Sequence, residues 1–275
     1  VVLGDGPNTA ALARAYGLDD SVHVALVGDA HALATDDPGP ERLVRVPAVA
    51  DTLLRKILRG ATQVLIEEAT DGATIDLARR VRAIPGYARS TLLLEDRDVA
   101  TQWNGADDSW AICRSAQLAL ELLRRNPPFL EDAMVPPPVV IGDGKTAGEV
   151  ARRIVTGWQQ PGERIIVHCV GREPDWLDAA RAGIAERAEF TWTDMGPHAA
   201  DGPGIVKDLV AQWRGPRAGR ATVKGPRVYV AYADATVGVP MACALAASLT
   251  PDALVIVLVD NADAWEHTLT GPGPV

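Results

Sequence analysis

Short apolar runs alternate along this chain with longer segments in which apolar residues recur every three or four positions. The first pattern is typical of strands in a parallel sheet covered on both faces, and the second of amphipathic helices. Their alternation predicts an α/β fold. In the first half we expect strands at 1–3, 22–27, 43–46, 63–66 and 91–94.

Helices are expected between these strands. One follows the opening turn, and Asp51 can cap another at 52–59. Asp71 precedes a third at 73–83, and apolar residues on one face predict a fourth at 111–125. The segment 96–108 is polar, and we expect it to be irregular.

The second half repeats this order. Strands are expected at 138–141, 165–170, 190–193, 227–231 and 253–259, and helices after the opening turn, at 205–213 and at 237–249. A single offset aligns Asp71 with Asp234 and Leu92 with Val255. The chain therefore reads as a duplication.

A proline-rich stretch separates the two halves, with five prolines between residues 126 and 138. Such a stretch is typical of a domain boundary. We predict two tandem Rossmann-like, doubly wound parallel-sheet units, 1–134 and 135–275, packed as an intramolecular pseudo-dimer. A homo-oligomer is also possible for such a chain.

Each half opens with a strand, a G-x-G turn and a helix, which is the start of a nucleotide-binding βαβ unit. Glycine allows positive φ and a close approach of phosphate to the backbone. The third glycine of the fingerprint is replaced by Thr9 in one half and by Ala147 in the other. The turns are candidate cofactor-binding sites, with a purely structural turn as the alternative. The residues concerned are Gly4, Asp5, Gly6, Asn8 and Thr9, and Gly142, Gly144, Lys145 and Thr146.

Four charged residues extend these candidate sites. Asp29 follows the second strand, where an acid can accept hydrogen bonds from ribose hydroxyls. Arg172 has the comparable place in the second half and could favour a 2′-phosphate, with a surface charge as the alternative. Asp71 and Asp234 follow the fourth strands, where they could line the crevice or cap a helix.

Composition narrows the class of function. The net charge is −9 and both halves are acidic, which argues against DNA or RNA as a partner. No apolar run approaches about eighteen residues, so we expect no membrane insertion. The cysteines Cys113, Cys169 and Cys243 are far apart, which suits a cytoplasmic location. The chain lacks an initiating Met, and we expect it to be part of a longer protein.

Catalytic motifs are scarce. There is no Tyr-x-x-x-Lys pair and no G-x-S-x-G, and the histidines lack metal-ligand spacing. His23 and His168 lie in apolar strands, where they are read as core or satisfied polar residues. Gly144-Lys145-Thr146 is no P-loop, because Val139 stands where that motif needs glycine. We expect a protein that is not an enzyme.

Several segments resemble the regulator of potassium conductance family, with NAD-binding domains of the TrkA-N type, in the tandem form of actinobacterial proteins. They are 139–152, 227–234 and 252–259 in the second half, and 63–98 and 118–129 in the first. The resemblance implies a cytosolic module that senses NAD or another adenine nucleotide and controls potassium or other cation movement through a partner channel or transporter.

The sequence departs from the family pattern at the third glycines, at Arg172, and in having no separate ligand lobe after either unit. Two alternatives therefore stay open: an NAD(P)-dependent oxidoreductase, and a degenerate scaffold for protein interaction. If a nucleotide binds, Asp29 favours the first unit.

Overall fold

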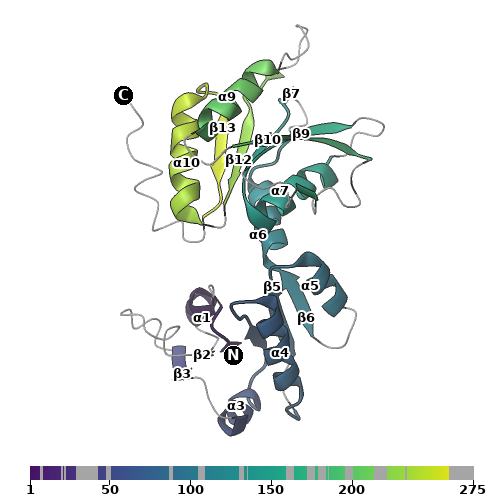
Figure 1. Ribbon diagram of the computed structural model, residues 1–275. Coiled ribbons are helices and arrows are strands. Elements are labelled where there is room, and N and C mark those ends of the chain that lie inside the picture. The colour runs from purple at the N-terminus through teal and green to yellow at the C-terminus, as the bar shows by residue number, and fades with distance from the viewer. Residues whose placement is uncertain are drawn as a thin grey trace. The chain divides into compact units, whose positions relative to one another are not determined.

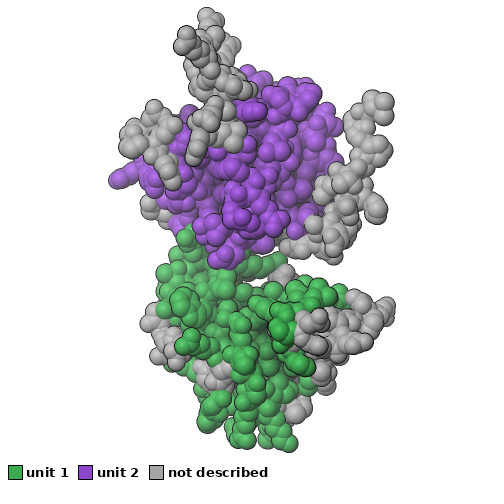
Figure 2. Space-filling model, turned by 180° about the vertical axis from the view of Figure 1, so that it is seen from behind, with its two compact units in different colours: residues 1–114 green, residues 115–275 purple. Residues whose placement is uncertain are grey.

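The computed structural model describes residues 1–6, 9–19, 21, 23–28, 43–47, 51–86, 89–104, 109–129, 133–134, 136–158, 164–171, 177–178, 184, 186–195, 201–213, 222–232 and 234–259. The chain forms two compact units, Val1–Arg114 and Ser115–Val275, called unit one and unit two below (Figure 2).

Unit one contains a six-stranded parallel sheet in the order β3-β2-β1-β4-β5-β6 (Figure 1). Its strands are β1 Val2–Leu3, β2 Val24–Gly28, β3 Leu43–Pro47, β4 Val64–Ile66, β5 Ser90–Leu94 and β6 Trp110–Cys113. Its helices are α1 Thr9–Gly17, α3 Asp51–Leu58, α4 Asp71–Arg82 and α5 Arg97–Trp103.

Unit two contains a five-stranded parallel sheet in the order β10-β9-β8-β12-β13. Its strands are β8 Val139–Gly142, β9 Ile165–Gly171, β10 Ala188–Asp194, β12 Arg227–Ala231 and β13 Leu254–Val257. Its helices are α6 Arg114–Arg125, α7 Gly144–Thr156, α9 Gly202–Gln212 and α10 Ala235–Ser248. The strands β7 Ala133–Met134 and β11 Thr222–Val223 form a small parallel sheet of their own.

Both sheets have the strand order of a doubly wound fold. β1 lies between β2 and β4, and β8 lies between β9 and β12. The connections reverse direction at these first strands, and in open α/β sheets a crevice forms at the carboxyl ends of the strands at that point. The predicted fold class is confirmed. One G-x-G turn follows β1 and the other follows β8, so each lies at a crevice.

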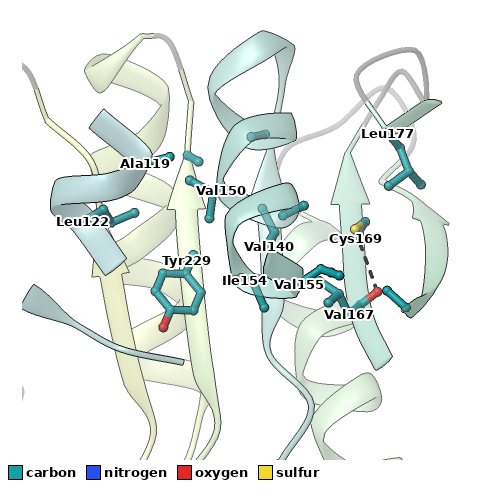
Figure 3. Close-up of a cluster of buried hydrophobic side chains, with 14 of the residues drawn as sticks. Ala119, Leu122, Val140, Val150, Ile154, Val155, Val167, Cys169, Leu177 and Tyr229 are labelled. Carbon is teal, nitrogen blue, oxygen red and sulfur yellow. Dashed lines mark hydrogen bonds between the residues drawn. The ribbon is translucent and has the colours of Figure 1, made fainter. Parts of the chain in front are cut away.

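The core of unit two has a layer on each face of the sheet, because alternate residues of a strand point to opposite faces. Val140 packs in a cluster with residues of α6 and α7 (Figure 3), whereas Val139 and Ile141 pack with residues of α9 and α10. Tyr229 of β12 is the largest fully buried side chain in the described part of the chain. Burial on both faces explains why these strands read as continuous apolar runs.

Unit one is built the same way. Val2 packs with Ala13 of α1 on one face of the sheet. Leu3 is also buried, and it lines a cavity together with Leu54 of α3 and Leu77 of α4. The helices therefore divide between the two faces, as a doubly wound sheet requires.

Two expectations for residues 96–125 need correction. The segment expected to be irregular contains α5, whose first N–H groups are capped by the Asp96 carboxylate, which accepts hydrogen bonds from the N–H groups of Asp98 and Val99. The helix expected from residue 111 begins at Arg114, because Ala111–Cys113 pairs with Leu92–Leu94 as strand β6. Apolar residues in these positions fit a strand and a helix equally well.

The division between the units also lies earlier than the expected 134/135 boundary. Ala119 and Leu122 of α6 are buried in the cluster that contains Val150 and Tyr229 of unit two (Figure 3). A helix whose apolar face is part of a core belongs to that unit. The contacts therefore divide the chain between Arg114 and Ser115, after the first residue of α6 and before the proline-rich stretch.

Strand register corrects the internal alignment by one position. Leu3 pairs with Ile66, and the equivalent Ile141 pairs with Val230. Thr70 follows Ile66 by as many positions as Asp234 follows Val230, so Asp234 is equivalent to Thr70. Both residues are helix N-caps. Asp71, which the sequence aligned with Asp234, is instead the first residue of α4.

Candidate functional site

The first G-x-G turn requires glycine at its first position. Gly4 has φ +110°, and a Cβ built on it would lie 2.0 Å from the carbonyl oxygen of Glu67. Its N–H donates a 2.9 Å hydrogen bond to the Val27 carbonyl oxygen. The turn is thus held between β2 and the end of β4.

The side chain of Glu67 lies over the second glycine. A Cβ on Gly6 would be 2.3 Å from Glu67 Cγ and 2.7 Å from Glu67 Cδ. The Gly6 N–H donates to the Glu67 carbonyl oxygen over 3.1 Å. Thr9, at the third glycine position, is buried and its hydroxyl lies 3.3 Å from Glu67 Oε2. The glutamate is 5% exposed, so it fills the space beside this turn.

A second carboxylate borders the same turn. Glu68 Oε2 accepts a 3.4 Å hydrogen bond from the Asp5 N–H, and its other oxygen would be 3.1 Å from a Cβ on Gly4. Asp5 and Glu68 line a cavity of about 110 Å³ at the ends of β1 and β2, together with Arg80. The lining of this cavity therefore includes acidic residues and one arginine.

The turn of unit two is open at its second glycine. A Cβ on Gly142 would be 2.3 Å from the Ala231 carbonyl oxygen, so this glycine is required by close packing. Gly144 has φ +64°, and nothing lies within 4 Å of a Cβ placed there. Asp143, Gly144 and Lys145 are exposed. The backbone at this turn is therefore accessible from solvent.

Helix α7 begins at Gly144, and the N-cap Asp143 makes no side-chain cap hydrogen bond. The first four N–H groups of a helix have no acceptor within it, and the helix dipole places partial positive charge there. This arrangement, with Lys145 in the first turn, suits a phosphate group. Thr146 faces elsewhere, since its hydroxyl donates to Ser115 Oγ of α6 over 3.4 Å.

The two turns differ in the two residues that stand at or just after the end of the fourth strand of each sheet. The Glu67 carbonyl oxygen faces Gly4 just as the Ala231 carbonyl oxygen faces Gly142. Glu67 and Glu68 of unit one thus correspond to Ala231 and Tyr232 of unit two. Tyr232 is buried, with its hydroxyl 3.5 Å from Met195 Sδ. Unit two has no carboxylate at either of these positions.

The remaining candidates have structural contacts or lie outside the described residues. The Asp71 carboxylate accepts 2.8 Å hydrogen bonds from the N–H groups of Glu95 and Asp96. Asp234 accepts from the Thr236 N–H and hydroxyl, at 2.8 and 2.7 Å, and these bonds lower its pKa. Asn8, Asp29 and Arg172 lie outside the described residues.

The two strand histidines also have distinct surroundings. His168 Nδ1 lies 2.6 Å from Thr191 Oγ1, which confirms its reading as a satisfied polar residue. His23 is exposed, so the core alternative does not hold for it. Across the described residues, no group of three His, Cys, Asp or Glu side chains could hold a metal ion. The helices described are all too short or too polar to cross a membrane.

Sequence reasoning missed Glu67 and Glu68. A signal was present, because two acids follow directly after the buried strand Val64–Ile66 and so stand at the carboxyl edge of the sheet. That their side chains border a turn more than sixty residues earlier in the chain follows only from the β1–β4 pairing.

No protein-family model matches the chain, and neither does a curated protein sequence. Seven chains of solved structures match it. The structure of GsuK bound to ADP is similar over 98% of this chain and 68% of that chain, with a TM-score of 0.50 and 16% identity. A dipicolinate synthase component from Bacillus halodurans matches over 98% of this chain and 87% of its own, with a TM-score of 0.30 and 14% identity. The likeness to GsuK shows the Rossmann-like fold.

Proposed function

We propose that this chain is a regulatory module that senses an adenine nucleotide and controls the movement of potassium or another cation through a partner channel or transporter. The nucleotide is ADP or a related compound, with NAD as the second choice. The module acts by binding and not by catalysis, and it works in the cytoplasm.

One observation carries the proposal: each sheet has a glycine turn at its switch point, and the first glycine of each turn cannot carry a side chain. Gly4 and Gly142 would both place a Cβ less than 2.5 Å from a backbone carbonyl oxygen. Nucleotides bind at this point of open α/β sheets, with phosphate at the helix N-terminus.

The likeness to GsuK, whose structure contains ADP, supports an adenine nucleotide as the ligand. The family resemblance of segments 139–152 and 227–234 supports a regulatory role in cation transport. Unit two offers the more accessible turn. Its phosphate position is formed by the first N–H groups of α7, with Lys145 as the nearby cation and exposed backbone at Gly144.

The test is a thermal melt of the full chain with AMP, ADP, ATP, NAD(H) and NADP(H), followed by calorimetric titration of the nucleotide that shifts it. A ligand at a hundred times its dissociation constant stabilises a protein by about 2.7 kcal/mol. We expect the largest shift with ADP. Gly144→Val should remove it, because the valine side chain occupies the open space at the turn.

Gly86→Val is the matched control. Gly86 has φ +75° and, like Gly144, has nothing within 4 Å of a Cβ. The two substitutions therefore impose similar backbone strain, and only one stands at a glycine turn. The nucleotide proposal fails if no compound shifts the melt. Steady turnover of a substrate with a nicotinamide cofactor would instead favour an oxidoreductase.

A further inference from the structure

We propose that Glu67 and Glu68 exclude phosphate from unit one, so that each chain binds a single nucleotide, in unit two. This inference rests on the proposed function and assigns the two acids as the residues that determine which unit binds. It reverses the expectation, based on Asp29, that unit one is the better site.

The first argument is steric. The second glycine of a dinucleotide fingerprint lets the backbone approach the pyrophosphate. In unit one that space is filled, since Glu67 Cγ and Cδ lie 2.3 and 2.7 Å from the place of a Cβ on Gly6. At Gly144 of unit two, nothing outside the neighbouring residues and the backbone of its own helix lies within 4 Å of a Cβ.

The second argument is electrostatic. A phosphate at the unit one turn would come close to the carboxylates of Glu67 and Glu68, and like charges at such distances repel strongly in a partly buried site. Glu67 is 5% exposed, so water screens it little. Glu68 additionally accepts the hydrogen bond of the Asp5 N–H, a donor that a phosphate would otherwise use.

The third argument explains why a buried acid is tolerated here. An acid is rarely this buried without hydrogen-bond donors. Glu67 lies beside the N-terminal end of α1, where the helix dipole favours negative charge, and the Thr9 hydroxyl is 3.3 Å from its Oε2. The carboxylate thus takes the electrostatic role that a bound phosphate has in a nucleotide-binding unit.

The experiment is a calorimetric titration of the full chain with ADP, which reports the number of sites. Wild type should show one site, lost in Gly144→Val and kept in Gly6→Val. Glu67→Ala with Glu68→Gln, where the alanine copies Ala231, should show two sites. In the Gly144→Val background this double variant should regain one site. That site should bind ADP at least about tenfold more tightly than any residual binding by Gly144→Val alone, as expected for restoring a charge-assisted hydrogen bond.

Two controls keep the outcome interpretable. Asp76→Asn with Glu121→Gln removes the same charge from exposed positions and should leave one site. Should a melt show that Glu67→Ala does not fold, Glu67→Gln with Glu68→Gln removes the charge and tests the electrostatic argument alone, because the glutamine side chain still fills the space beside Gly6.

The results separate this inference from the proposed function. The inference is overturned if a Gly6→Val variant that still folds lacks the wild-type site, or if the folded Glu67→Ala, Glu68→Gln variant in the Gly144→Val background binds no ADP. Binding by the Glu67→Ala, Glu68→Gln variant but not by wild type would support the exclusion of phosphate by Glu67 and Glu68, but it would overturn both the single site in unit two and nucleotide sensing by the natural chain. Absence of binding in every variant would overturn both.

Discussion

The hydroxyl of Tyr229 donates a 2.8 Å hydrogen bond to the carbonyl oxygen of Asn126, the residue that follows α6. The Arg227 guanidinium donates to the carbonyl oxygen of Pro127, and the rings of Phe129 and Trp158 pack edge to face with centroids 4.6 Å apart. Burial also raises the pKa of Tyr229, which keeps its hydroxyl a donor. The start of the proline-rich stretch is therefore attached to unit two.

This attachment predicts the behaviour of two truncated chains. A chain of residues 115–275 should fold cooperatively, whereas one of residues 135–275 should be less stable by more than about 3 kcal/mol. The shorter chain loses the packing of Ala119, Leu122 and Leu123, and burial of one leucine side chain contributes about 1.5–3 kcal/mol. Urea denaturation followed by circular dichroism measures the difference. Equal stability would place the boundary after α6.

Asp71 gives a prediction for unit one. Asp71→Ala should lower the free energy of unfolding by about 2 kcal/mol, because two backbone N–H groups lose a charged acceptor. Asp76→Ala on the same helix is the matched control. Its ion pair with Arg79 is exposed, so the loss should stay below about 0.5 kcal/mol. If both variants behave alike in urea denaturation, the Asp71 contacts contribute nothing.

The strands were the most predictable part of the fold. The apolar runs at 138–141, 165–170 and 227–231 correspond to β8, β9 and β12, because a strand buried on both faces needs an apolar side chain at nearly every position. The segment at 96–113 was less predictable. α5 has few apolar residues, and β6 leads directly into α6 without a turn signal.

The site was predictable only in part. Gly4, Gly6, Gly142 and Gly144 follow from the strand–turn–helix pattern and are found at the two switch points. The contrast between the turns was not visible, since it depends on the Glu67 side chain reaching Gly6 from the end of β4. Asp71 was expected, from its place after β4, to line the crevice or to cap a helix, but its carboxylate binds the chain after β5.

We predict that His168 makes the stability of unit two depend on pH. Burial lowers the pKa of His168 below 6.5, although Glu189 opposes this shift. Between the lowered value and 6.5 the unfolded chain binds more protons than the folded chain, so stability should fall as pH falls through this window. His168→Gln should flatten the dependence of the melting temperature between about pH 8 and about pH 5.5. An unchanged pH profile in the variant would show that other groups cause the dependence.

Three of the turn glycines provide the final prediction, because the substitution of each by alanine should have a different structural cost. Gly4→Ala combines a positive φ with a Cβ 2.0 Å from a backbone oxygen, so we expect the largest loss of stability. Gly142→Ala meets the Ala231 carbonyl at 2.3 Å and should cost about 1–3 kcal/mol through overpacking. Gly144→Ala has open space and carries only the left-handed strain, about 1–2 kcal/mol.

Asparagine distinguishes strain from crowding at these positions, because it adopts the left-handed region more readily than alanine does. Gly144→Asn should therefore be less destabilising than Gly144→Ala, whereas Gly142→Asn should be at least as harmful as Gly142→Ala, since the larger side chain meets the same carbonyl oxygen. Urea denaturation of the four variants measures both differences. If asparagine gave no advantage at Gly144, the left-handed backbone of the unit two turn would be wrong, and with it the open approach that a phosphate needs.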